Sequence, residues 1–311
     1  MTKSTRGYAI GAVAAATYGL NPLFALPCYA GGMNADSVLF FRYLLAIVIV
    51  GVMLRARGHS FAVERRQALP LLAMGLLLAV SSLTLFESYN YMSSGIASTL
   101  LFVYPVMVAV IMAAVFRERL SWVTAASIAA SLAGIALLYR GDGHTTLSVT
   151  GTVLVMLSSL SYAIYIVCVN RRPLAEMPSL KLTFWALTAG LLVFGSRFAA
   201  RVPLTLPADA ALWLNLAGLA VFPTAVSFLC TTRAIQLIGS TPTAILGALE
   251  PLTATVIGII VFHETLTGRD ITGILLILGA VTAVVAGGGP LSAVIVRLRK
   301  MFPRVIHYNK K

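Results

Sequence analysis

Apolar windows of about twenty residues recur along this chain, and this pattern constrains the fold more than any other feature. A helix needs roughly 20 apolar residues to cross the hydrocarbon core of a bilayer. Backbone polar groups in lipid must be satisfied within their own segment, so each window predicts a helix rather than a loop. The sequence therefore predicts an all-α integral membrane protein with ten transmembrane helices, over Tyr8–Cys28, Ser37–Leu54, Ala68–Glu87, Gly95–Phe116, Trp122–Tyr139, Thr150–Val169, Leu180–Phe198, Leu212–Thr231, Thr241–Phe262 and Ile271–Gly287.

The composition excludes several classes of soluble protein. Hydrophobic residues make up 59% of the chain and charged residues 11%, which is more apolar surface than one water-facing domain can bury. The net charge of +13 comes from basic residues between apolar runs, so it predicts no nucleic-acid partner. Cys28, Cys168 and Cys230 show no metal-binding or redox spacing, and we expect them to be packing residues. The expected partners are membrane lipid and a small-molecule substrate, with no cofactor and no metal.

The distribution of Lys and Arg predicts the orientation in the membrane. With the N-terminus in the cytosol, 18 of the 23 fall on the cytosolic side, 4 on the opposite side, and Arg42 lies within a span. Cytosolic loops are enriched in Lys and Arg, so both termini are expected in the cytosol. The first window has no A-x-A cleavage site and is expected to be retained. No Asn-x-Ser/Thr acceptor occurs, which favours a bacterial inner membrane.

The chain contains an internal repeat. Tyr104-Pro105 is followed twelve residues after the proline by Arg117-Glu118-Arg119-Leu120. At an offset of 146, Glu250-Pro251 is followed at the same spacing by His263-Glu264-Thr265-Leu266. The register of proline, glutamate and leucine across a whole hairpin indicates a duplication.

Each half then holds five spans, and an odd number places the second half upside down in the membrane. We expect a first repeat over residues 1–144, a second, inverted repeat over 145–289 and a basic cytosolic tail over 290–311 that rests on anionic lipid. Inverted repeats are a recurring architecture of alternating-access carriers, with the substrate near the midplane. The alternative is that duplication merely makes a stable bundle.

These features resemble a known family. The ten-span layout, the paired Pro and Arg/His-Glu-x-Leu segments and Phe41-Arg42-Tyr43 are similar to the drug/metabolite transporter superfamily, EamA type. The run Leu85-Phe86-Glu87-Ser88-Tyr89, with Val103-Tyr104-Pro105, is most similar to its branch of aromatic amino-acid exporters. The resemblance implies a basket of ten helices around a central cavity and export of small amphipathic metabolites. The halves differ in one place, because Glu250 stands where the first half has Tyr104.

Glu250 is the most informative single residue. It lies about nine residues, or roughly 14 Å, into its span, and an acid at the bilayer midplane usually faces a cavity or a partner. We expect it to bind a substrate ammonium group or to exchange a proton. Its neighbour Pro251 is expected to disturb the preceding turn and leave carbonyl groups free. The alternative is a protonated acid hydrogen-bonded to a neighbouring helix.

Arg42 and Glu87 both lie near the external side. Arg42 is about 9 Å deep, from which a long side chain can snorkel to the surface. A pair with Glu87, at the end of span three, predicts an external gate or a site for a substrate carboxylate. A structural salt bridge or a snorkelling arginine is the alternative.

Aromatic residues are the remaining candidates for the site. Gly19 and Pro22 weaken span one midway, with the amide of Asn21 beside the break, and interrupted helices often line transporter sites. Pro105 occupies the corresponding place in span four that Pro251 has in span nine. An aromatic wall accepts a ring while its hydroxyl groups contact polar atoms, although many membrane aromatics form interfacial belts instead. The candidates for this wall are Tyr18, Tyr89, Tyr104, Tyr162, Tyr165 and Trp185.

Taken together, the residues predict a secondary transporter that exports small amphipathic metabolites, above all aromatic or large neutral amino acids, by alternating access. It is expected to be a monomer or a weak homodimer. Export of other metabolites or lipophilic drugs is the alternative. An intramembrane enzyme is disfavoured because the sequence holds no H-E-x-x-H and no G-x-S-x-G motif. A channel is disfavoured because no repeated carbonyl-type filter sequence is present.

Overall fold

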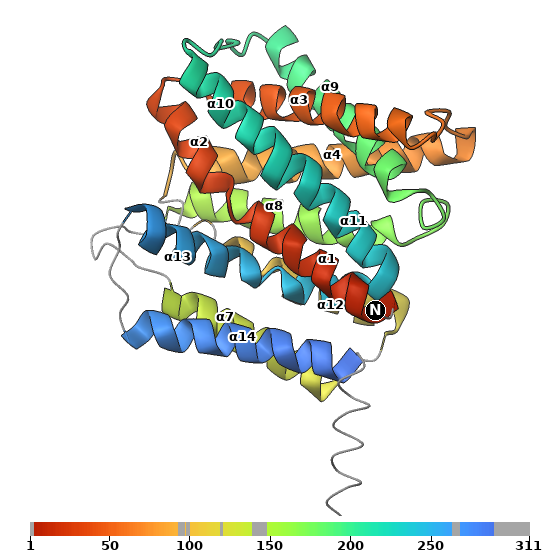
Figure 1. Cartoon of the computed structure of the whole chain (residues 1–311), viewed down its shortest axis with the longest axis vertical. Coiled ribbons are helices and arrows are strands. Elements are labelled where there is room, and N and C mark those ends of the chain that lie inside the picture. The colour runs from red at the N-terminus through yellow and green to blue at the C-terminus, as the bar shows by residue number, and fades with distance from the viewer. Residues whose placement is uncertain are drawn as a thin grey trace, which may run out of the picture.

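The computed structural model describes residues 3–92, 97, 100–118, 121–138, 148–262 and 268–288 of the 311-residue chain. Within these ranges the regular structure is helical, with no strand. The helices group along the chain into ten segments (Figure 1): α1 (Lys3–Tyr18) with α2 (Asn21–Ala30), α3 (Ala35–Ala56), α4 (Arg65–Ser88), α6 (Tyr104–Phe116), α7 (Trp122–Leu138), α8 (Val149–Val169), α9 (Ser179–Ala199), α10 (Ala210–Leu219) with the π-helix η1 (Ala220–Val226) and α11 (Ser227–Ile238), α12 (Ser240–Leu246) with α13 (Leu249–Phe262), and α14 (Gly268–Gly288).

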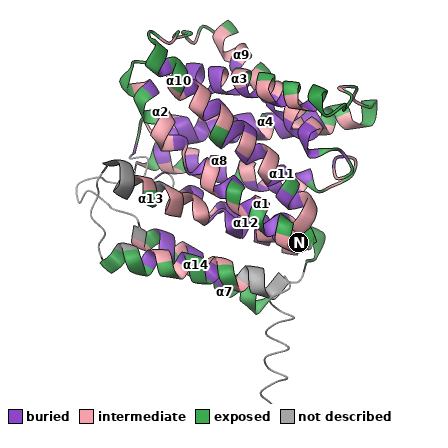
Figure 2. Ribbon diagram, in the orientation of Figure 1, coloured by how far each residue is buried: buried purple, intermediate pink, exposed green. Residues whose placement is uncertain are grey.

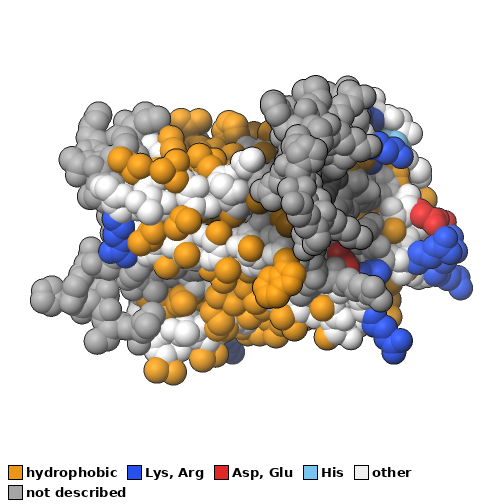
Figure 3. All heavy atoms as spheres, turned by 90° about the horizontal axis from the view of Figure 1, so that it is seen from below, with side chains coloured by type: hydrophobic (Ala, Val, Ile, Leu, Met, Phe, Trp, Pro, Cys, Tyr) orange, Lys and Arg blue, Asp and Glu red, His pale blue; other side chains and the backbone are white. Residues whose placement is uncertain are grey.

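The surface of the bundle suits a lipid environment. Among the described residues, six helical segments are long and apolar enough to cross a membrane, and three shorter apolar helices accompany them. Figure 3 shows hydrophobic side chains over the middle of one face, with most of the visible Lys and Arg side chains toward the ends of the helices. Large apolar side chains such as Val48, Leu69 and Val149 are exposed, while the inward sides of the helices are buried (Figure 2). This confirms the all-α membrane fold.

The packing of the helices repeats when the two halves are exchanged. Helix α1 packs along α11, and their equivalents in the other half, α8 and α4, pack along each other. The pairs α3 with α9 and α7 with α14 each join a helix to its own counterpart (Figure 1). The core therefore lies between the halves, and the two inverted repeats build one bundle.

Spans four and nine are interrupted at matching places. Helix α6 begins at Tyr104 with Pro105 in its first turn, and α13 begins at Leu249 with Pro251 in its first turn. Proline is accepted in the first turn because the N–H groups there have no partner within the helix. The sequence predicts a disturbed turn before Pro251 in span nine, and the structure has one: Gly247 and Ala248 separate α12 from α13, and Glu250 lies in the first turn of α13.

Spans one and eight are also irregular. Span one breaks at Gly19 and Leu20, before Asn21 and Pro22, as the sequence predicts. Span eight contains the π-helix η1 around Pro223, where the sequence predicts one uninterrupted helix. A π-turn is wider than an α-turn and is frequent at functional sites.

Candidate functional site

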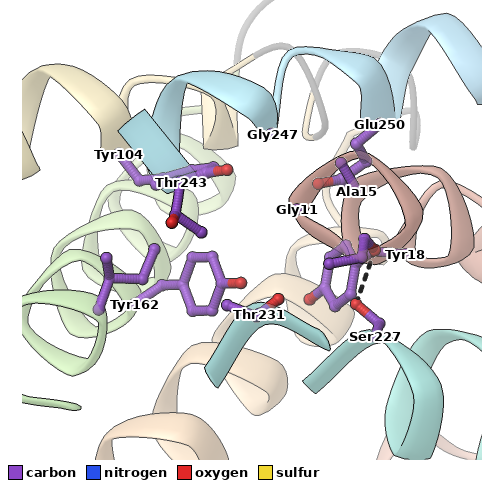
Figure 4. A pocket seen from close by; sticks show the side chains of 12 residues that line it. Gly11, Ala15, Tyr18, Tyr104, Tyr162, Ser227, Thr231, Thr243, Gly247 and Glu250 are labelled. Carbon is purple, nitrogen blue, oxygen red and sulfur yellow. Dashed lines mark hydrogen bonds between the residues drawn. The ribbon is translucent and has the colours of Figure 1, made fainter. Parts of the chain in front are cut away.

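A small cavity lies at the centre of the bundle, between the two halves (Figure 4). Its volume is about 20 Å³, which is room for a water molecule but not for a metabolite. The first half contributes Gly11, Ala14, Ala15, Tyr18 and Tyr104, from α1 and α6. The second half contributes Tyr162, Ile166, Ser227, Thr231, Thr243, Gly247 and Glu250, from α8, α11, α12 and α13.

Tyrosine rings form one wall of this cavity, from three of the six predicted candidates for an aromatic wall. Tyr18 stacks on Tyr162 with ring centroids 6.4 Å apart, and Tyr104 meets Tyr162 edge to face at 5.0 Å. The Tyr104 hydroxyl donates a hydrogen bond to the Ala244 carbonyl, 3.2 Å away near the end of α12. This bond joins the interrupted helix of one half to the interrupted helix of the other. The wall is therefore shared between the halves and held by a contact at their break points.

Glu250 lies across the cavity from Tyr104 and Tyr162 (Figure 4). The first turn of α13 presents it where backbone N–H groups favour negative charge. The backbone at Gly19 approaches the Glu250 carbonyl so closely that no Cβ fits between them. Among the described residues Glu250 forms no ion pair within 4 Å. A carboxylate so placed can accept hydrogen bonds from a cationic or hydroxylated substrate.

Arg42 is fully buried beside this cavity, with 0% of its surface exposed. Its guanidinium donates to Asn21 Oδ1 at 2.9 Å, to Thr224 Oγ1 and to the Pro223 carbonyl at 3.2 Å. The wide turn of η1 makes this possible, because Thr224 bonds back to the Leu219 carbonyl and Pro223 has its own carbonyl turned to Arg42. Arg42 thus ties the first half to the second.

The expectation that Arg42 snorkels to the surface or pairs with Glu87 is wrong. The side chain is enclosed by rings of Tyr18, Phe86 and Phe228, whose centroids lie 6.0, 5.5 and 5.9 Å from the guanidinium carbon. No Arg42–Glu87 ion pair occurs in the described part of the chain. Neutral acceptors on the π-helix and the faces of aromatic rings satisfy this cation instead of a carboxylate.

Besides Tyr89, which is described below, three predicted candidates lie away from the central cavity. Tyr165 is buried and its hydroxyl contacts Thr232, outside the lining. Trp185 donates its indole N–H to the Phe61 carbonyl, in the segment between α3 and α4. Asn21 accepts a hydrogen bond from the Arg42 guanidinium and is not part of the cavity lining.

Several lining residues are not predicted from the sequence. The hydroxyl groups of Ser227, Thr231 and Thr243 face the cavity, and Ser and Thr are too common in membrane helices to stand out. Gly247 packs against the Tyr104 hydroxyl, where a Cβ would collide with it. Gly11 is part of Gly7-x-x-x-Gly11, a pattern that signals close helix approach rather than a cavity.

A second, larger hollow lies at the end of the bundle opposite Lys3, and we name it the distal vestibule. It is about 640 Å³ in volume, and the end of α2, the start of α3, the end of α4 and the segment after α9 form its walls. Tyr89 and Glu87 lie here rather than in the central cavity. Phe86 separates the two spaces: its ring contacts Tyr29 and Tyr89 of the vestibule, and the Arg42 guanidinium lies 5.5 Å from the same ring.

Comparison with known proteins agrees with this arrangement of two halves. The sequence profile of the EamA-like transporter family matches the chain twice, over residues 5–140 and 149–286. The chain belongs to the EamA-like transporter family. The two matches correspond to the two repeats of the fold, and residues 141–147 between them lie outside the described residues.

Relatives that this chain resembles over most of its length are named as transporters. The uncharacterized inner membrane transporter YicL of Salmonella typhimurium is 26% identical over 80% of this chain and 84% of its own. An uncharacterized transporter of Archaeoglobus fulgidus is 30% identical over 80% of this chain and 86% of its own. A solved crystal structure superimposes with a TM-score of 0.79, covering 94% of this chain and 99% of the other at 18% identity, which shows a shared fold. This EamA-like protein is accordingly a multi-pass membrane transporter of small molecules.

Proposed function

We propose that this EamA-like transporter exports an amphipathic amino acid with an aromatic or large neutral side chain, by alternating access. The observation that carries the proposal is that one acidic side chain and a tyrosine wall face each other in a cavity between two inverted halves. In this arrangement Glu250 accepts the substrate ammonium group. Tyr104 and Tyr162 receive the apolar side chain, and the hydroxyl groups of Thr231 and Thr243 contact its polar atoms.

The small size of the central cavity supports an alternating-access mechanism in which the two halves move apart. A volume of about 20 Å³ excludes any amino acid, so the halves must separate before a substrate enters. The Arg42 contacts with Thr224 and the Pro223 carbonyl hold the halves together on the vestibule side. We therefore assign Arg42 the role of a clamp that opens toward the vestibule during each cycle, with Pro22, Pro105 and Pro251 at the breaks where helices bend. Membrane orientation enters the same proposal, with both termini in the cytosol of a bacterial inner membrane.

A second candidate function follows from the charges on the lining. Glu250 is its one charged residue among the described positions, and every basic side chain lies elsewhere. A protonated amine with an apolar body, such as a lipophilic drug, meets this lining without needing a partner for a carboxylate. An amino acid needs a partner for its carboxylate. The Arg42 guanidinium, 6.0 Å from the Tyr18 ring, is the candidate for this partner.

Flux through reconstituted protein separates the two candidates. Liposomes holding the purified transporter are loaded with labelled phenylalanine, tyrosine or leucine, and efflux is measured with and without a pH gradient. The amino-acid proposal expects saturable efflux that the matching decarboxylated amine inhibits weakly. Efflux of the labelled decarboxylated amine, loaded in the same way, with no amino-acid efflux would support the drug-like candidate and overturn the first. The domain boundaries at 144 and 289 and the monomeric or weakly dimeric state stay predictions.

A further inference from the structure

The distal vestibule has the size and the walls of a ligand site. Pockets that bind metabolites usually measure about 300–1,000 Å³, and this one measures about 640 Å³. Rings of Tyr29 and Tyr89 and the side chain of Met33 give it an apolar lining. It is separated from the central cavity by Phe86 and by Arg42 with its fixed hydrogen bonds. A ligand in the vestibule therefore binds at a site separate from the central cavity while that cavity is closed.

Most polar groups around the vestibule are already occupied within the protein. Asp36 is buried and forms an ion pair with Arg197. The Asn34 side chain donates to the Pro203 carbonyl and accepts from the Ser37 N–H. These residues shape the wall, and none offers a free charge to a ligand.

Two groups are not occupied in the part of the chain that the structure describes. The Glu87 carboxylate makes no ion pair within 4 Å and no hydrogen bond to the described residues. The Tyr29 hydroxyl oxygen is buried and has no hydrogen-bond partner. Both line the same hollow, and a buried polar atom without a partner costs stability unless something binds it. A group that donates hydrogen bonds and carries positive charge satisfies both.

We propose that the distal vestibule is a second binding site, for a protonated amine on an apolar or aromatic body. Glu87 accepts the ammonium group, the Tyr29 hydroxyl completes its hydrogen bonds, and the Tyr29 and Tyr89 rings contact the cation and the body. An anionic ligand is rejected because Glu87 repels it and Arg197 is held by Asp36. This site does not depend on the proposed function, since it binds its ligand whether or not the central cavity carries an amino acid.

Protection of a single cysteine from labelling tests this site directly. The free residues Cys28, Cys168 and Cys230 are replaced by serine and Asn90, which is exposed on the vestibule wall, by cysteine. The protein is placed in lipid nanodiscs and labelled with a charged maleimide in the presence of phenethylamine. The proposal expects saturable protection by phenethylamine and none by 3-phenylpropionate, which has a similar body and the opposite charge.

Variants then separate the vestibule from the central cavity. Glu87→Gln should raise the half-protecting concentration of phenethylamine about tenfold, and Glu87→Asp should keep protection within about threefold. Glu250→Gln should leave it unchanged. Equal protection in Glu87→Gln, equal protection by the anion, or loss of protection in Glu250→Gln would each overturn the proposal. The melting temperature of every variant is measured, and Glu87→Asp supplies the folded reference if Glu87→Gln is unstable.

Discussion

The two halves of this transporter share one arrangement of helices and differ in the side chain that each presents at the break in its fourth helix. Spans four and nine both break just before a proline, and both present the residue before that proline to the central cavity. In the first half this residue is Tyr104, whose hydroxyl bonds to the other half. In the second it is Glu250, which has no ion-pair partner among the described residues. Duplication thus supplied the frame, and under the proposed function divergence gave polar recognition of the substrate to the second half alone.

The largest expected effect comes from removing the negative charge of Glu250 in the second half. Glu250→Gln keeps the shape and loses the negative charge, so substrate flux in proteoliposomes should fall at least about thirtyfold, the usual consequence of leaving a buried cation without its partner. Glu176→Gln is the matched control, because Glu176 lies on an exposed segment beside Arg172 and should transport normally. Normal flux in folded Glu250→Gln protein would remove the functional difference between the halves.

The next effect concerns the clamp that joins the halves. Arg42→Lys keeps the charge but loses the planar fork, so Asn21, Thr224 and the Pro223 carbonyl cannot all be bonded at once. Thermal unfolding in detergent should show a loss of about 2–4 kcal/mol. Arg55→Lys, at the exposed end of the same helix α3, should change stability by less than about 0.5 kcal/mol. Equal stability of the two variants would contradict the clamp.

A smaller effect is expected where the halves touch at Tyr104. Gly247→Ala places a methyl group against the Tyr104 hydroxyl and forces the ring toward the cavity, so flux should fall about tenfold with stability reduced by about 1–3 kcal/mol. Gly279→Ala, on α14, meets open space and should transport normally. If Gly247→Ala transports like Gly279→Ala, Tyr104 is not the close neighbour of the break in span nine.

The smallest effect is expected in the first half, where Tyr104 loses its hydroxyl group. Tyr104→Phe keeps the ring and loses one hydrogen bond to the Ala244 carbonyl, so stability should fall by about 0.5–1.5 kcal/mol and flux by less than about fivefold. The ratio of the flux loss in Tyr104→Phe to the flux loss in Glu250→Gln measures how differently the two halves contribute to transport. A larger flux loss in Tyr104→Phe than in Glu250→Gln would reverse the roles assigned to them.

Most of the fold was predictable because a bilayer leaves few choices for an apolar chain. Window length predicted the helices, and the match of Tyr104-Pro105 with Glu250-Pro251 predicted that these positions share a register and a cavity. Arg42 was not predictable in the same way. Its partners Thr224 and Pro223 lie about 180 residues away and depend on a π-turn that only a proline hints at. Pairing by opposite charge suggested Glu87, whereas the structure satisfies the cation with neutral oxygens and rings.

The central claim is that the two halves rock about the cavity between Tyr104 and Glu250, and labelling of one residue from both sides of the membrane tests it most directly. Thr243, which faces the cavity, is replaced by cysteine in a chain whose native cysteines are serine, and proteoliposomes of known orientation are exposed to an impermeant thiol reagent outside or inside. The account predicts slow labelling from each side and protection from both by the transported substrate. Labelling from one side only, in protein that still transports, would contradict it.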